Sequence, residues 1–178
     1  KVLDVGGGSG LHYHIVKSFK GNNLFKWDVL ETPEMVKYNS DNLFKELFFH
    51  ENLKVLKENN YDLIFLSGVI QYVKNPYKFL DDLLDIESKK IVITRTPFNF
   101  KNEEFYSIQK SFLSENGPGI LPSGFKNRLV KYPHFSFNFN YFIKYLNDKG
   151  FKTISTVYEG EWTLNSENYK MLTLFISK

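Results

Sequence analysis

The chain has 178 residues, of which 42% are hydrophobic, 17% aromatic and 24% charged. These fractions exclude collagen-like, coiled-coil and disordered chains, and the length suits one domain with a single core. A net charge of +3 with both signs interspersed argues against a nucleic-acid partner, and the absence of cysteine excludes disulfides and thiolate metal sites.

No apolar run approaches the ~20 residues that cross a bilayer, so we expect no membrane span. The chain opens on Lys1 inside a strand-like run, without an initiator Met or a signal-like segment. We therefore expect residues 1–178 to be a single domain whose native N-terminal segment has been removed, and we expect a cytoplasmic location. The oligomeric state stays open.

Segments with the period of strands and of helices alternate along the first 95 residues. We predict strands at 1–5, 25–30, 47–50, 62–67 and 90–94, with helical segments that begin near residues 11, 32, 53 and 75. Thr32 is a good N-cap and Pro33 suits the first helical position. This alternation with short connections predicts an open, mostly parallel sheet with helices on both faces.

The pattern changes after Arg95. Residues 96–137 hold clustered Pro, Gly, Ser and Asn, including a hinge-like Gly117-Pro118-Gly119, so we predict a substrate-side insertion or lid there. A short helix is predicted at 103–112. Regular structure returns with a helix at 138–149 and two final strands at 152–158 and 169–177.

A glycine-rich turn, G-x-G-x-G at Gly6, Gly8 and Gly10, lies directly between the first strand and the first helix. Glycine allows a tight turn and lets a ligand lie against bare main chain. A dinucleotide fingerprint would need another glycine where Leu11 or Tyr13 stands, and no G-K-[ST] follows for a triphosphate. Glu31, about 20 residues further at the end of the second strand, can accept both ribose hydroxyls of an adenosine ligand.

The segment from Val2 to Gly10 resembles motif I of class I S-adenosylmethionine-dependent methyltransferases, and Glu31 falls at that superfamily's ribose-binding acid. Residues 61–73 are similar to its motif around strand four. The resemblance covers nearly all of the chain. It implies a doubly wound, mostly parallel, seven-stranded Rossmann-like sheet with an antiparallel C-terminal strand and an insertion after strand five. The superfamily's usual helix before motif I is missing from this sequence.

A narrower resemblance is to a bacterial group of methyltransferases whose genes often accompany those for surface polysaccharide synthesis. It rests on W-x-V-x-E-x-P from Trp27 to Pro33, on the pair Gln71-Tyr72, and on Thr94-Arg95-Thr96-Pro97. This resemblance implies a saccharide-like acceptor.

The superfamily resemblance also implies roles around a bound S-adenosylmethionine. Asp4 would orient the methionine moiety, and Glu31 would hold the ribose. The other implied cofactor contacts are Gly6, Gly8, Ser9 and Gly10 along the amino-acid tail, Thr32 and Pro33 beside the adenine, and Ser67, Gln71 and Tyr72 beside the sulfonium. No cluster of Asp, Glu and His has metal-ligand spacing, so we predict no metal.

Methyl transfer mainly requires alignment of the nucleophile with the methyl group, and an oxygen nucleophile must also lose its proton. His134, in the insertion, and Tyr72 are the predicted catalytic residues. The only two arginines, Arg95 and Arg128, lie at the edge of the insertion and within it, so we predict that they bind an anionic group of the acceptor.

The expected activity is transfer to an oxygen of a small or saccharide-like acceptor. Two alternatives remain at this point. One is a non-catalytic module that binds S-adenosylmethionine, and the other is a nicotinamide oxidoreductase, which Leu11 and Tyr13 disfavour.

Overall fold

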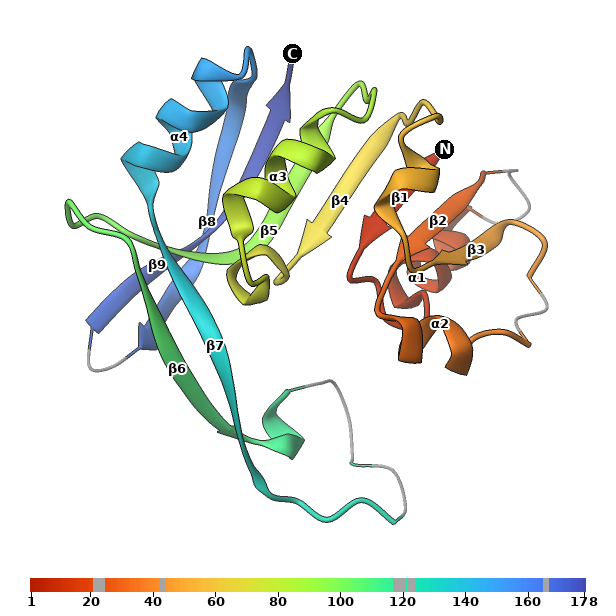
Figure 1. The fold of residues 1–178 in the computed structure, drawn as a ribbon, viewed down its shortest axis with the longest axis horizontal. Helices are drawn as coiled ribbons and strands as arrows, with labels where there is room; N and C mark the ends of the chain where they lie inside the picture. The colour runs from red at the N-terminus through yellow and green to blue at the C-terminus, as the bar shows by residue number, and fades with distance from the viewer. Residues whose placement is uncertain (21–24, 42–43, 117–120, 122–123, 165–166) are drawn as a thin grey trace.

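The computed structural model describes residues 1–20, 25–41, 44–116, 121, 124–164 and 167–178 (Figure 1). The first half of the chain alternates strands with helices, and the second half is dominated by long strands. The elements in chain order are β1 (Val2–Val5), α1 (Leu11–Lys20), β2 (Trp27–Leu30), α2 (Pro33–Tyr38), β3 (Leu47–His50), the 3₁₀ turn η1 (Leu53–Leu56), β4 (Leu63–Ser67), η2 (Ile70–Tyr72), α3 (Pro76–Leu84), β5 (Ile91–Asn99), β6 (Phe105–Phe112), η3 (Leu113–Glu115), β7 (Leu129–Asn138), α4 (Phe139–Asp148), β8 (Lys152–Leu164) and β9 (Glu167–Ser177).

The strands pair in the order β3-β2-β1-β4-β5, all parallel, and the sheet continues through β9 to β8. β9 runs antiparallel to both of its neighbours, so it is the reversed strand of this seven-strand path. The predicted fold class is confirmed. The chain leaves β1 toward β2 and β3 and then returns to place β4 on the other side, which makes β1 the switch point where ligands bind in such sheets.

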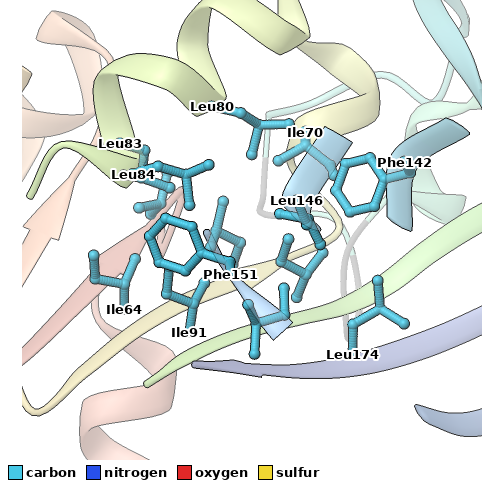
Figure 2. Close-up of a cluster of buried hydrophobic side chains, with 14 of the residues drawn as sticks. Ile64, Ile70, Leu80, Leu83, Leu84, Ile91, Phe142, Leu146, Phe151 and Leu174 are labelled. Carbon is cyan, nitrogen blue, oxygen red and sulfur yellow. The ribbon is translucent and has the colours of Figure 1, made fainter. Parts of the chain in front are cut away.

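Apolar side chains cover the sheet on both faces. On one face, Leu3, Ile64 and Ile91 pack with α3 and α4 into the larger core cluster, part of which Figure 2 shows. On the other face, Tyr13 of α1 packs on Trp27 and neighbouring β2 and β3 residues. The period-two alternation of β1 and β2 therefore sends Leu3 toward α3 and Asp4 toward α1.

The segment predicted as a helix at 103–112 is a strand, so that prediction was wrong. β6 pairs antiparallel with β7 along its whole length, from Phe105 opposite Ser136 to Phe112 opposite Leu129. Its side chains alternate between half-buried and exposed, which is the period of a strand with one covered face. Residues 105–112 and 129–137 of the predicted insertion thus form a β-hairpin, attached to the sheet where the end of β7 pairs with the end of β5. Gly117-Pro118-Gly119 lies outside the described residues.

Candidate functional site

The glycine-rich turn adopts a backbone that side chains disfavour. Gly6, Gly8 and Gly10 have φ angles of +69°, +58° and +83°. A Cβ at Gly6 would lie 2.4 Å from Val69 Cγ2, so that glycine is required by packing within the protein. A Cβ at Gly8 would meet nothing within 4 Å. Gly8 therefore faces open space, where a ligand could lie against the main chain.

Asp4 lies beneath this turn and is fully buried. Its Oδ2 accepts a hydrogen bond from Trp27 Nε1 at 3.1 Å and lies 3.0 Å from His12 Nδ1. Its Oδ1 is also buried and has no partner among the described residues. A Cβ at Gly7 would lie 2.5 Å from Asp4 Oδ2, so Gly7 leaves the room that the carboxylate occupies. A buried carboxylate oxygen without a partner is a candidate ligand contact.

Gly7 and His12 have no role predicted from the sequence. Nothing in their local pattern marks them, because both matter only through their position against Asp4. Both belong in the candidate site.

Glu31, at the end of β2, lies directly against the glycine-rich turn. Its Oε1 accepts from the Gly8 backbone N–H at 3.0 Å, and its Oε2 accepts from the Thr32 backbone N–H at 2.9 Å. Each carboxylate oxygen keeps a further lone pair. Thr32 and Pro33 begin α2 as its N-cap and first residue, both exposed beside Glu31.

The carboxyl end of β4 forms a third part of the site. Ser67 ends the strand, and Gly68 follows with a φ of +66°. The Gln71 side chain is buried; its Nε2 donates to the Arg95 carbonyl at 3.2 Å, whereas its Oε1 has no partner among the described residues. Tyr72 OH donates to Gln109 Oε1 at 3.1 Å, which ties η2 to the hairpin.

Aromatic side chains surround His134 on the inner side of the hairpin. The Tyr72 ring lies 5.7 Å from the His134 ring and 5.3 Å from the Tyr132 ring. The ring of Trp162, which belongs to β8, lies 5.0 Å from the His134 ring. His134 has no exposed surface, and neither ring nitrogen has a partner among the described residues. Burial lowers the pKa of His134 to about 4 and raises the pKa of Tyr72. His134 is therefore neutral at pH 7.

The structure places the two predicted catalytic residues, Tyr72 and His134, side by side. His134 is nevertheless enclosed by its aromatic neighbours, so it would reach an acceptor only after Tyr72 or Trp162 moved. Trp162 and Gln109 were not found from the sequence, because an isolated Trp or Gln in a strand carries no pattern of its own.

The two arginines lie in different places. Arg95 has the left-handed φ of +54°, which is uncommon for a residue with a side chain and is found often at functional sites. Its positive charge acts on Tyr72 and opposes the rise in the pKa of that hydroxyl. Arg128 is exposed at the far end of the hairpin, where its carbonyl accepts from the Leu113 N–H. The site near β4 and β5 thus includes Arg95 but not Arg128.

A cavity of about 680 Å³ runs along the free edge of β6 toward β8. Gln109 and Trp162 line this cavity and connect it to the aromatic side chains around His134. The other lining residues are Ile108, Lys110, Ser111, Glu115, Asn116 and Thr163. Within the described ranges, no group of three or more His, Cys, Asp or Glu could hold a metal ion, and no helix is long and apolar enough to cross a membrane.

Solved structures with a similar fold include several with S-adenosylmethionine or S-adenosylhomocysteine bound. An S-adenosylmethionine-dependent methyltransferase from Clostridium acetobutylicum matches 99% of this chain and 82% of its own, with a TM-score of 0.58 and 15% identity. The glycopeptide N-methyltransferase MtfA, in complex with S-adenosylhomocysteine, matches 99% of this chain and 80% of its own, with a TM-score of 0.61 and 10% identity.

The fold is that of S-adenosylmethionine-dependent methyltransferases. A chain described as a pericyclic reaction enzyme shares it, with a TM-score of 0.60 and 11% identity over 99% of this chain and 42% of its own.

No family model matches the sequence. An uncharacterized protein of Methanocaldococcus jannaschii is 29% identical over 88% of this chain, which spans only 42% of that protein's length. At these sequence identities the similarity establishes the fold alone, so the reaction has to be inferred from the residues of the candidate site.

Proposed function

We propose that this chain binds S-adenosylmethionine and transfers its methyl group to an oxygen of a small or saccharide-like acceptor. The observation that carries the proposal is the contact between Glu31 and the Gly8 N–H beside open space at Gly8. It joins an acid suited to ribose hydroxyls to a backbone suited to close approach by a ligand.

The residues present fit this cofactor. Asp4 would supply, on the methionine side, a buried oxygen that has no partner among the described residues, and Glu31 would supply lone pairs on the ribose side. The turn from Gly6 to Gly10, including Ser9, would follow the amino-acid tail, and Thr32 and Pro33 would flank the adenine. Ser67 and Gln71 would complete the cofactor contacts at the end of β4, where Gln71 Oε1 also has no partner in the part of the chain that the structure describes.

The acceptor side is proposed to begin at Tyr72. When bound, S-adenosylmethionine supplies an electrophilic methyl group on a sulfonium, so the protein has mainly to align the acceptor oxygen. Tyr72 would hold that oxygen. His134 lies behind it and would serve as a base only once the aromatic cover opens and water reaches its ring, because burial lowers its pKa to about 4. The resemblance to methyltransferases found with polysaccharide genes supports a saccharide-like acceptor.

Glu31→Ala should weaken the binding of S-adenosylmethionine by about 1.5–3 kcal/mol, or roughly 10- to 150-fold, because it removes a charge-assisted contact to the ribose. Glu31→Gln keeps one acceptor oxygen and should lose less. Calorimetric titration measures both, with Glu58→Ala as an exposed-carboxylate control. Unchanged affinity in a folded Glu31→Ala protein would contradict the ribose assignment.

Arg95→Lys should reduce acceptor efficiency by roughly 10- to 150-fold, because lysine keeps the charge but cannot form a planar two-bond contact with an anionic group. Affinity for the methyl donor should stay nearly constant. The measurements are turnover against acceptor concentration and a separate donor titration. Arg128→Lys is the comparison: an equal loss there would mean that the acceptor reaches the far end of the hairpin. Equal losses of donor and acceptor binding in Arg95→Lys would instead place Arg95 in the cofactor site.

The second candidate is a protein that binds the cofactor without transferring its methyl group. It is favoured by the enclosure of His134, which has no exposed surface. Release of S-adenosylhomocysteine in the presence of candidate saccharides distinguishes the two. Donor binding without any product across a broad acceptor panel would support the non-catalytic reading.

A further inference from the structure

The β6–β7 hairpin has two chemically different faces. Residues that lie opposite each other in an antiparallel strand pair have their side chains on the same face, so the register assigns each hairpin residue to one of the two faces. The inner face carries Gln109, Tyr132 and His134, which contact Tyr72 as described above. We call the opposite side the outer face; its members beyond the middle of the hairpin are Ile108, Lys110, Phe112, Leu129 and Lys131.

The outer face is apolar and exposed. Ile108, Phe112 and Leu129 have 56%, 49% and 51% of their surface exposed, and Phe112 lies directly opposite Leu129. Phe125, in the segment that leads into β7, is 63% exposed. Large apolar side chains gathered at one exposed end indicate an interaction surface rather than scattered surface residues.

The same face is also basic. Lys110 lies directly opposite Lys131, an arrangement that destabilises a strand pair. Neither lysine forms an ion pair with any residue that the structure describes. Lys126 and Arg128 add positive charge in the exposed segment before β7. An external anionic surface would offset the repulsion that the hairpin itself leaves uncompensated.

Figure 1 shows that the hairpin extends away from the sheet, with η3 and the start of β7 at its far end. Phe112 is seven positions after Phe105, so the far end lies about 23 Å along the strand from the first β6 residue. Near the sheet the outer face is covered, because Phe135 packs against Tyr77 of α3, so the part that can meet another surface is the far end.

We propose that the outer face of the hairpin binds the surface of a membrane that contains anionic lipid. Exposed Phe, Leu and Ile side chains can enter the boundary between headgroups and acyl chains while neighbouring lysines contact lipid phosphates. A nucleic acid or an acidic protein would use the lysines but would give the apolar side chains no comparable role. The inference does not depend on the proposed methyl transfer, because Phe112, Leu129 and Lys131 do not line the cavity beside Trp162, although Ile108 and Lys110 do.

The test is co-sedimentation of the protein with vesicles of phosphatidylcholine alone or of phosphatidylcholine with phosphatidylglycerol. We expect binding only to the anionic vesicles. The double variant Lys110→Gln with Lys131→Gln should bind about 30-fold more weakly, because each lysine near an anionic surface contributes about 5-fold. The double variant Phe112→Ser with Leu129→Ser should also lose binding. The control Lys54→Gln with Lys152→Gln makes the same change of charge on exposed lysines elsewhere and should bind like the parent protein.

A second readout uses the absence of cysteine from the chain. Phe112→Cys and, as the control, Phe19→Cys on the exposed side of α1 can each carry one polarity-sensitive dye. The dye at position 112 should shift to the blue on anionic vesicles and the dye at position 19 should not. Equal shifts at both positions, equal losses in the control lysine variant, or binding to soluble polyanions that ignores the Phe112 and Leu129 substitutions would each overturn the proposal.

Discussion

Replacing Gly8 with valine is expected to weaken the binding of S-adenosylmethionine by about 150-fold or more, equivalent to about 3 kcal/mol. A Cβ at Gly8 meets no protein atom within 4 Å, so the branched side chain would occupy the open space proposed for the ligand. It would also be strained by the φ of +58°, at a cost to stability of about 1–2 kcal/mol.

Gly150→Val is the matched control for this prediction. Gly150 follows α4, has a φ of +81°, and likewise has open space where its Cβ would lie. Thermal unfolding should show comparable losses of stability in the two variants, whereas calorimetric titration should show lost affinity only in Gly8→Val. Normal donor binding by Gly8→Val would mean that the turn is a structural feature without a ligand.

The free energy of unfolding is expected to fall by about 3 kcal/mol between pH 6.5 and pH 4 because of His134 alone. The buried imidazole has its pKa lowered to about 4 from the ordinary 6.5. Above pH 6.5 it is neutral in both folded and unfolded chains and imposes no penalty. As the pH falls below 6.5, the unfolded chain gains a proton that the folded chain binds only near pH 4, so the unfolded state is favoured.

His134→Phe should remove this component and leave stability at pH 7 unchanged or higher, since it deletes two buried nitrogens that have no partner among the described residues. Urea unfolding across the pH range measures the effect, with the exposed His14→Phe as the control. If the parent protein and His134→Phe lost stability in parallel, another buried group would have to be responsible.

The sequence was informative wherever function depends on neighbours along the chain. The glycines of the turn and Glu31 could be predicted because a strand–turn–helix–strand unit has a nearly fixed length. An acidic residue at the end of β2 therefore lies next to the turn that follows β1. The contact between Glu31 and Gly8 fulfils that geometric expectation. Thr32 and Pro33 likewise marked the start of α2 correctly, because capping is local.

The sequence was less informative where distant segments decide the structure. β6 was mistaken for a helix because one of its faces is exposed and mixes Tyr, Ile and Lys, and its pairing with β7 cannot be seen locally. Gly7 and His12 were not predicted because their importance depends on contact with the buried Asp4 carboxylate, which the sequence does not reveal. Trp162 was missed because its partner His134 lies on another strand.

The positions of the two tryptophans have a spectroscopic consequence. Trp27 donates its indole N–H to Asp4 beneath the glycine-rich turn, and Trp162 borders the cavity along β6. The chain has no other tryptophan. It therefore carries one tryptophan on each side of the proposed site. A Trp162→Phe protein keeps Trp27 and would report donor occupancy, whereas a Trp27→Phe protein keeps Trp162 and would report acceptor occupancy, without any added label.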